Sequence, residues 1–269
     1  MATKAAGLLA ALALGLGAAA RADVWDLGTD NDDDTGSDNE IVHGISQVHD
    51  LGAQAAGTVE DEDWYPLNLA HGRSIEVRVE GITGDLSNGP ASPIVELRTA
   101  AGVFVQGAEL ATDFGRARSL RFASTSSGTI GHTSYFVRVA NPACATGCTG
   151  DDEYRIRAYD TTLALPRFNN TGGQVTVLIL QNPTSRPIFY VASAWTNGGV
   201  YLGSFGSTVA PYATAVTNVG TVNSGELANQ SGSLVIRNNG PYQGLAGKGV
   251  AVEPATGFTF DTALTAAPQ

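Results

Sequence analysis

The residues with the clearest capacity for chemistry are acidic and lie near the start of the chain. The segment DNDDDTGSDNE, residues 30–40, is followed further along by EDED, residues 60–63. Calcium is a hard cation that takes about six to eight oxygen ligands in proteins. The second stretch can supply some of these oxygens, and the first can supply several from the following residues: Asp30, Asp32, Asp34, Asp38, Asn39 and Glu40. The sequence therefore predicts calcium as a candidate ligand.

The spacing of the first acidic segment does not fit an EF-hand loop. When Asp30 is placed first, Gly36 falls one position late, and no glutamate stands at the twelfth position. The alternative is a solvated acidic linker followed by a polar turn, because a segment this poor in apolar residues cannot bury enough surface to fold alone. Both interpretations remain open at the level of sequence.

Recognisable catalytic motifs are absent from the sequence. There is no Gly-x-Ser-x-Gly nucleophile turn. The histidines, none of which belongs to an HExxH metal pair, are expected at the surface or in turns: His43, His49, His71 and His132. Glycoside hydrolysis needs two carboxylates, but we expect the available ones to be solvated in exposed strand positions or turns: Glu62, Asp63, Glu76 and Asp85. We predict a protein that is not an enzyme, with an unrecognised secreted hydrolase as a less favoured alternative.

The compartment is indicated by the first residues. Lys4 precedes an apolar run over residues 5–20, which ends in Ala20-Arg21-Ala22. This pattern predicts a secretory signal peptide over residues 1–22 and a secreted protein, in the extracellular space, at the cell surface or in the periplasm. A membrane anchor is the competing interpretation, but it needs about 20 apolar residues. No later segment is apolar enough to span a membrane.

The two cysteines, Cys144 and Cys148, lie close together in the segment PACATGCTGDD. In an exported chain this spacing favours a disulfide that closes a small loop. A reactive thiol pair is the alternative, but it has two intervening residues and sits at a strand-to-helix junction, whereas this pair has three and no such pattern around it.

The charge of the chain is negative and uneven. The formal net charge is −11, and eight acidic residues fall within residues 23–40 with no basic residue among them. Residues 163–269 hold four basic and three acidic side chains. Because nucleic-acid binding needs a clustered basic face, we expect no nucleic-acid partner. Residues 23–40 are predicted to be an acidic leader.

Short runs with apolar residues at alternate positions predict an all-β fold. The first group of runs begins at Ser74, Pro93, Ser119, Ser134 and Glu153, and turn-rich segments separate its members. It predicts an antiparallel β-sandwich over residues 41–162. Pro166 and the cluster NNTGG mark a boundary. A second group of runs begins at Gln174, Pro187, Ala213, Gly232 and Lys248, and it predicts an immunoglobulin-like β-sandwich over residues 163–269. The run QVTVLILQN is apolar on both faces, which indicates a strand in the middle of a sheet.

The stretch GTVEDEDWYPLNLAHGRSIEVRVEG, with TSYFVRVAN and DDEYRIRAYD downstream, resembles the bacterial pre-peptidase C-terminal (PPC) domain. The match covers about half of the chain that follows the signal peptide, and it rests on these residues: Asp61, Asp63, Trp64, Gly72, Tyr135, Val137, Arg138, Val139 and Tyr154. The resemblance implies a β-sandwich of exported proteins. The related collagen-binding domains of clostridial collagenases bind calcium beside this acidic turn. By analogy, a calcium site would form where the leader folds back onto the turn, from Asp38, Asn39, Glu40, Asp61 and Asp63.

The second half resembles the C-terminal region of uncharacterised exported proteins from environmental bacteria, which implies an architecture and no activity. Trp64 and Tyr65 begin a strand, so one of them should enter the core while the other stays at the edge. Core packing is also the favoured interpretation of Trp195, Tyr201 and Tyr212, although they can form a sugar-stacking platform.

Taken together, these features predict a non-enzymatic binding, adhesion or structural module that is secreted or lies at the cell surface, with calcium as the candidate stabilising ion. Its partner would be an extracellular protein or polysaccharide, and a carbohydrate-binding protein is the alternative. The oligomeric state is not indicated.

Overall fold

The computed structural model describes residues 32, 34–51, 62–83, 93–110, 117–124, 131–141 and 153–267. Within these ranges the chain is almost entirely β-strand, with one short 3-10 helix at Asn223–Gly225 and no α-helix. The predicted all-β fold is therefore confirmed. In the described part of the chain, no helix has the length and apolar character needed to cross a membrane. The predicted signal peptide, Cys144 with Cys148, Asp61 and Asp85 all lie outside the described residues.

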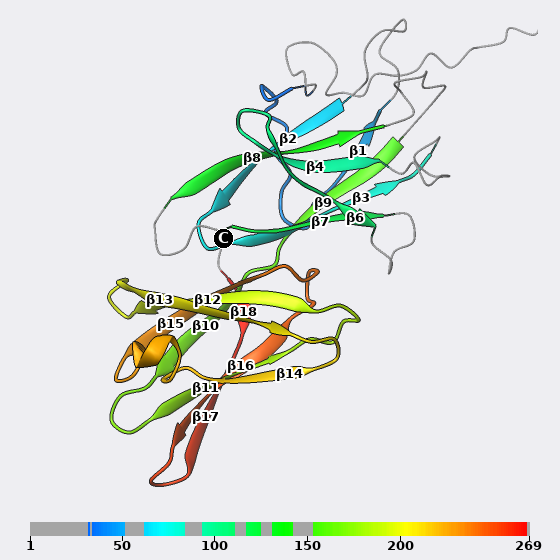
Figure 1. Cartoon of the computed structure of the whole chain (residues 1–269). Coiled ribbons are helices and arrows are strands. Elements are labelled where there is room, and N and C mark those ends of the chain that lie inside the picture. The colour runs from blue at the N-terminus through cyan, green and yellow to red at the C-terminus, as the bar shows by residue number, and fades with distance from the viewer. Residues whose placement is uncertain are drawn as a thin grey trace, which may run out of the picture.

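The first half of the chain forms two facing antiparallel sheets (Figure 1). One sheet has the order β1-β9-β3-β7-β6 and the other β2-β8-β4-β5. Their strands are β1 (Ser46–Asp50), β2 (Glu62–Ala70), β3 (Ser74–Gly81), β4 (Ile94–Thr99), β5 (Phe104–Gly107), β6 (Glu109–Leu110), β7 (Arg118–Ala123), β8 (His132–Ala140) and β9 (Glu153–Asp160). The apolar side chains between the sheets form one buried cluster, which includes Val77, Leu97, Leu120, Val137 and Ile156.

The second half forms another pair of antiparallel sheets, with the orders β13-β12-β15-β10-β18 and β14-β11-β16-β17. Its strands are β10 (Leu163–Asn169), β11 (Val175–Gln181), β12 (Ile188–Thr196), β13 (Tyr201–Val209), β14 (Thr214–Asn218), β15 (Ser231–Asn238), β16 (Ala246–Glu253), β17 (Phe258–Ala263) and β18 (Thr265–Ala266). A separate buried cluster, which includes Leu165, Leu178, Tyr190, Leu234 and Ile236, lies between them. Strand β11 lies between β14 and β16, so its predicted central position is confirmed.

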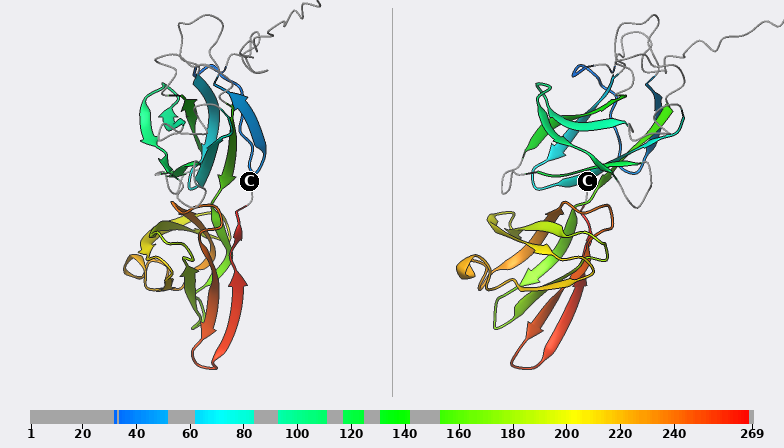
Figure 2. Two further views of the ribbon diagram at one scale, coloured as in Figure 1. Left: turned by 90° about the vertical axis from the view of Figure 1, so that its right-hand side faces the viewer. Right: turned by 45° about the vertical axis from the view of Figure 1, so that its right-hand side comes forward.

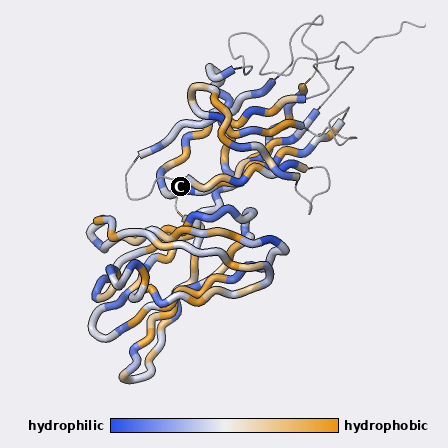
Figure 3. Tube along the Cα trace, in the orientation of Figure 1, coloured by the Kyte–Doolittle hydropathy of each residue, from blue (hydrophilic) through white to orange (hydrophobic). Residues whose placement is uncertain are grey.

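Alternation along the strands explains both cores. In β9, Tyr154, Ile156 and Ala158 are buried while the residues between them are partly exposed. Successive side chains of a strand point to opposite faces, so one face of β9 enters the core. Figure 3 shows the result as hydrophobic and hydrophilic segments that alternate along the strands of both halves.

The two sandwiches are stacked end to end, and the chain crosses between them where β9 passes into β10 (Figures 1 and 2). Hydrogen bonds also join the two sandwiches. The backbone N–H of Asn238 donates to Ser74 Oγ at 3.1 Å. The backbone N–H of Tyr242 donates to Glu76 Oε2 at 2.8 Å. Strand β9 ends at Asp160 and β10 begins at Leu163, next to the predicted domain boundary, which itself stays a prediction.

The paired aromatic residues at the start of β2 differ from the sequence-based expectation, because Trp64 and Tyr65 are both buried. Tyr65 enters the core of the first sandwich. Trp64 lies on the opposite face of the sheet, where Phe136 meets it edge-on at 6.1 Å between ring centroids and the guanidinium of Arg98 lies 5.6 Å from its ring. The outer face is therefore covered by side chains here, and both aromatic residues are buried although β2 is the edge strand of its sheet.

The three aromatic residues weighed as a sugar platform do not share one environment. Trp195 and Tyr201 are partly buried and pack against each other, with ring centroids 5.1 Å apart, whereas Tyr212 is 74% exposed.

Candidate metal centre

Three ligand-type side chains from separate segments converge at one edge of the first sandwich. Asp32 precedes β1, His49 lies in β1 and Asp63 lies in β2. One ligand atom from each residue lies within 4.8 Å of the others. All three residues are at most 1% exposed. In the part of the chain that the structure describes, these three form the one group of His, Cys, Asp and Glu side chains with metal-binding spacing.

Backbone contacts bring the three segments together. The N–H of Trp64 donates to the carbonyl oxygen of Asp32 at 2.7 Å, which attaches the leader to β2. In β1, His49 stands directly opposite Tyr154 of β9 and points inward, while its neighbour Val48 is exposed. The alternation of β1 therefore places the imidazole between the leader and β2.

Hydrogen bonds around His49 indicate which ring nitrogen faces the cluster. The side-chain N–H of Gln47 donates to the backbone carbonyl of Glu40 at 2.9 Å. The other atom of the same amide, Gln47 Oε1, therefore faces His49 Nε2 at 3.2 Å. Since Oε1 only accepts hydrogen bonds, Nε2 carries the hydrogen. In the neutral ring, Nδ1 then presents its lone pair toward Oδ2 of Asp32, 4.0 Å away. A lone pair and a carboxylate repel each other unless a proton or a cation lies between them.

Asn39 contributes a fourth polar group. Its side-chain N–H donates to Oδ2 of Asp32 at 3.3 Å, and the residue is only 3% exposed. Its Oδ1 is buried and accepts no hydrogen bond from the described residues. A buried acceptor in this state is costly, and coordination to a cation would satisfy it.

Two tyrosine hydroxyls lie behind Asp63. The hydroxyl of Tyr154 donates to Oδ2 of Asp63 and also contacts the hydroxyl of Tyr65. Burial, together with the negative charge of Asp63, raises the pKa of Tyr154 well above its usual value of 10.0. Tyr154 therefore stays protonated and holds the carboxylate in place. The rings of Tyr154 and Tyr65 also contact His49, at centroid distances of 5.7 and 5.1 Å.

The cluster has the chemistry of a divalent-cation site. Two carboxylates, a carboxamide oxygen and an imidazole nitrogen are all metal ligands in proteins. The oxygens suit calcium, whereas the imidazole does not, because calcium sites are built from oxygen alone. Zinc and manganese accept both oxygen and nitrogen ligands.

The structure places the residues nominated from the sequence in different settings. Asp32, Asn39 and Asp63 belong to the cluster. The side chains of Asp34, Asp38 and Glu40 are exposed, and Asp30 and Asp61 lie outside the described residues. The ligands predicted from the sequence did not include His49, which was expected at the surface or in a turn. That expectation was wrong because β1, an edge strand, turns this side chain into the sandwich.

The expectation that the acidic strand residues are solvated also needs correction. Asp63 is fully buried and accepts a hydrogen bond from the hydroxyl of Tyr154. Glu76 is 1% exposed and accepts hydrogen bonds from Ser119 at 2.6 Å and from Arg121 at 3.2 Å. Both carboxylates are thus engaged by internal donors.

Comparison with known proteins gives little further information. No protein-family model and no curated protein matches the chain. Among solved structures, a β-glucuronidase of Bacteroides uniformis aligns over 77% of this chain and 26% of its own, with 12% identity and a TM-score of 0.21. A β-glucuronidase of glycoside hydrolase family 2 aligns over 84% of this chain and 25% of its own, with 9% identity and a TM-score of 0.20. The chain thus spans about a quarter of the length of each.

Proposed function

We propose that the chain is a secreted, non-enzymatic binding module in which a divalent cation fastens the N-terminal segment to the first sandwich. Its ligand would be an extracellular protein or polysaccharide. The observation that carries the proposal is the buried convergence of Asp32, Asn39, His49 and Asp63. These groups come from three segments, so a cation between them would tie the leader, β1 and β2 together.

The buried state of these groups supports a structural role for the cation. A catalytic metal keeps a coordination position open to substrate. Here Asp32, His49 and Asp63 are at most 1% exposed, and the Tyr154 ring lies against the imidazole. The other buried carboxylate, Glu76, is bound by Arg78, Arg121 and Ser119. Internal partners hold these carboxylates, which favours a role in the fold over a role in catalysis.

The cation itself is tested by thermal unfolding of the chain, stripped with EDTA and then titrated with calcium, zinc or manganese. A ligand that binds the folded state alone raises the melting temperature as its concentration rises. Calcium is the ion expected from the sequence, and the imidazole of His49 adds zinc and manganese to the proposal. A melting temperature that none of these ions changes at millimolar concentration contradicts the cation.

Matched variants locate the cation. We expect Asp63→Asn and Asn39→Ala to lose the shift. Asp38→Asn and Glu40→Gln change exposed residues of the same segment and should keep it. A loss of the shift in these control variants alone would place the cation elsewhere.

The binding role is tested separately with the labelled chain on arrays of glycans and extracellular-matrix proteins. Retention on one class of ligand is expected, without change in the ligand's mass. Mass spectrometry of the retained ligand detects any cleavage. A cleaved ligand would contradict the non-enzymatic part of the proposal.

A further inference from the structure

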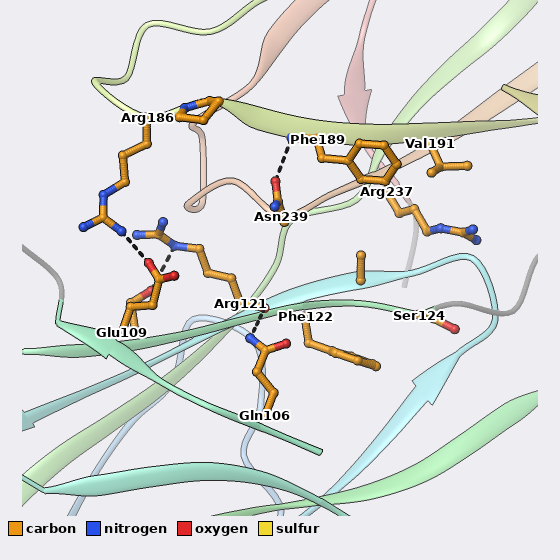
Figure 4. Close-up of a pocket in the computed structure, with 13 residues that line it drawn as sticks. Gln106, Glu109, Arg121, Phe122, Ser124, Arg186, Phe189, Val191, Arg237 and Asn239 are labelled. Carbon is orange, nitrogen blue, oxygen red and sulfur yellow. Dashed lines mark hydrogen bonds and ion pairs between the residues drawn. The ribbon is translucent and has the colours of Figure 1, made fainter. Parts of the chain in front are cut away.

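A cleft of about 790 Å³ opens between the two sandwiches (Figure 4). Its upper wall comes from β5, β6, β7 and the residue that follows β7, and includes Gln106, Glu109, Arg121 and Ser124. Its lower wall comes from the start of β12 and the end of β15. Sites for small organic ligands commonly have volumes of about 300–1,000 Å³ and lie at domain interfaces. The cleft therefore has the size and the place of a ligand site.

The lining of the cleft is basic although the chain is acidic. Three arginines line it, Arg121, Arg186 and Arg237, and Glu109 is the single acidic residue among the described lining residues. The chain as a whole has a formal net charge of −11. Charges further apart than about 8 Å are largely screened at physiological ionic strength. Within that range Glu109 pairs with Arg186 and the buried Glu76 pairs with Arg121, so part of the positive charge is neutralised. The remaining excess of arginine over acidic residues in the lining favours an anion.

The arginines are held in defined positions. The Nε of Arg121 donates to Glu76 at 3.2 Å and to Ser119 at 3.0 Å. Arg186 forms an ion pair with Glu109 across the mouth of the cleft. Arg237 is 7% exposed, and burial lowers its pKa, so a bound anion would offset part of the cost of burying its charge.

An apolar surface lies between the charged ends. Phe189 and Val191 alternate with the buried Ile188 and Tyr190 along β12, so both face the cleft. Val191 stands opposite Arg237 in the register of β12 with β15. Figure 4 shows the ring of Phe189 between Arg186 and Arg237. At about 3.3 Å per residue, the five residues of chain from Arg186 to Val191 span roughly 16 Å, which suits an extended ligand with more than one negative group.

Three of the lining strands are interior strands of their sheets: β7 lies between β3 and β6, and both β12 and β15 have a neighbour on each side. The short strands β5 and β6, which contribute Gln106 and Glu109, are edge strands. An extended peptide commonly binds by adding a strand to a free sheet edge, and β7, β12 and β15 present none. The cleft instead offers side chains: guanidinium groups, the amide of Gln106 and an aromatic ring that is 48% exposed. The negative face of such a ring attracts the C–H groups of a sugar.

We propose that the cleft between the two sandwiches binds an acidic oligosaccharide, with Arg186, Arg121 and Arg237 pairing with its anionic groups and Phe189 stacking on a sugar ring. The anionic groups are carboxylates or sulfates, since a guanidinium pairs with both. This inference names the ligand class of the binding role proposed above and rests on it, but it does not depend on the cation.

Calorimetry with three tetrasaccharides tests the ligand class: a galacturonate, a sulfated chondroitin fragment and neutral maltotetraose. Binding of either acidic probe, or of both, with no binding of maltotetraose, is the expected result, and which one binds identifies the anionic group. Binding should weaken as salt is added. Equal affinity for the neutral probe, or no binding of either acidic probe, overturns the inference.

Two variants that should change the affinity in opposite directions locate the site. Arg186→Gln should weaken binding about tenfold, because an arginine–anion contact is charge-assisted. Glu109→Gln should strengthen it about threefold, because it releases Arg186 and removes the acidic residue from the lining. Both residues are on the surface, so the fold should persist. Arg167→Gln is the control, an exposed arginine on β10 that does not line the cleft, and it should leave affinity unchanged.

The outcomes also separate this inference from the proposed function. If Arg186→Gln binds like Arg167→Gln while the acidic probe still binds, the cleft is the wrong place and the binding role stands. If no acidic probe binds but the chain is retained on matrix proteins, the ligand class is wrong and the binding role again stands. If the chain is retained on no glycan and no protein, the proposed function fails with the inference.

Discussion

The side-chain amide of Asn238 donates a hydrogen bond of 2.8 Å to the carbonyl oxygen of Thr161, across the junction of the two sandwiches. Asn238 lies at the end of β15, and Thr161 lies between β9 and β10. Both residues are buried, and the N–H of Asn238 also donates to Ser74. Asn238 therefore joins the second sandwich to the connector through its side chain and to the first sandwich through its backbone N–H.

Replacing Asn238 with alanine should loosen this junction. The variant leaves the carbonyl of Thr161 buried without that donor, which costs about 1–3 kcal/mol. Denaturant unfolding should show this loss of free energy, whereas Asn197→Ala, in an exposed turn, should show almost none. An equal loss in both variants would show that the junction contact contributes nothing specific.

Acid should weaken the junction at Glu76. Burial raises the pKa of Glu76, but hydrogen bonds from Arg78, Ser119 and the N–H of Tyr242 outweigh it and hold the pKa below its usual value of 4.5. A carboxyl group with a lowered pKa stabilises the folded chain at pH values above 4.5, and this contribution is lost as pH falls through the folded-state pKa. We expect Glu76→Gln to destabilise the chain by about 3 kcal/mol at neutral pH.

The measurement is unfolding free energy against pH for both proteins. The difference between wild type and Glu76→Gln should shrink as the solution becomes acidic. Glu80→Gln, whose residue is an exposed member of the same strand, is the control. A difference that stays constant down to the acid range would show that the charge of Glu76 is not what stabilises the junction.

The identity of the cation should change with His49. His49→Asp replaces an imidazole nitrogen with carboxylate oxygens, which gives an all-oxygen site. Calcium prefers such a site, whereas zinc and manganese lose a nitrogen ligand. The shift in melting temperature should therefore rise for calcium and fall for zinc relative to wild type. An unchanged order of the metals would indicate that His49 is not a ligand.

Tyr154 should matter for stability through Asp63. Tyr154→Phe keeps the ring against His49 and removes the hydroxyl that donates to the carboxylate. Loss of a hydrogen bond to a buried charged group costs about 1–3 kcal/mol. The loss should be smaller when a cation is bound, since the cation stabilises the same carboxylate. Tyr212→Phe, at an exposed position, provides the control.

Alternation predicted strands such as β3 and β9 because each buries its apolar residues on one face. Strand β11 was predicted from a short apolar run that covers both of its faces. Strand β13 was not predicted, because its sequence, YLGSFGSTV, is rich in small residues and shows little alternation of apolar and polar residues. Three members of the candidate metal centre, Asp32, Asn39 and Asp63, were predicted as oxygen ligands because they lie in acidic segments. His49 could not be found in this way, since its position depends on the pairing of β1 with β9, which joins residues far apart in the chain.

The backbone N–H of Ala267 donates to the carbonyl oxygen of Thr162 at 3.0 Å, and β18 pairs with β10 at Leu163 and Ala164. The second sandwich thus begins and ends at neighbouring points. A pulling force applied to the two ends of the second sandwich would therefore act first on the hydrogen bonds between β10 and β18. The other strands of this sandwich would unfold and extend only after β18 has separated from β10.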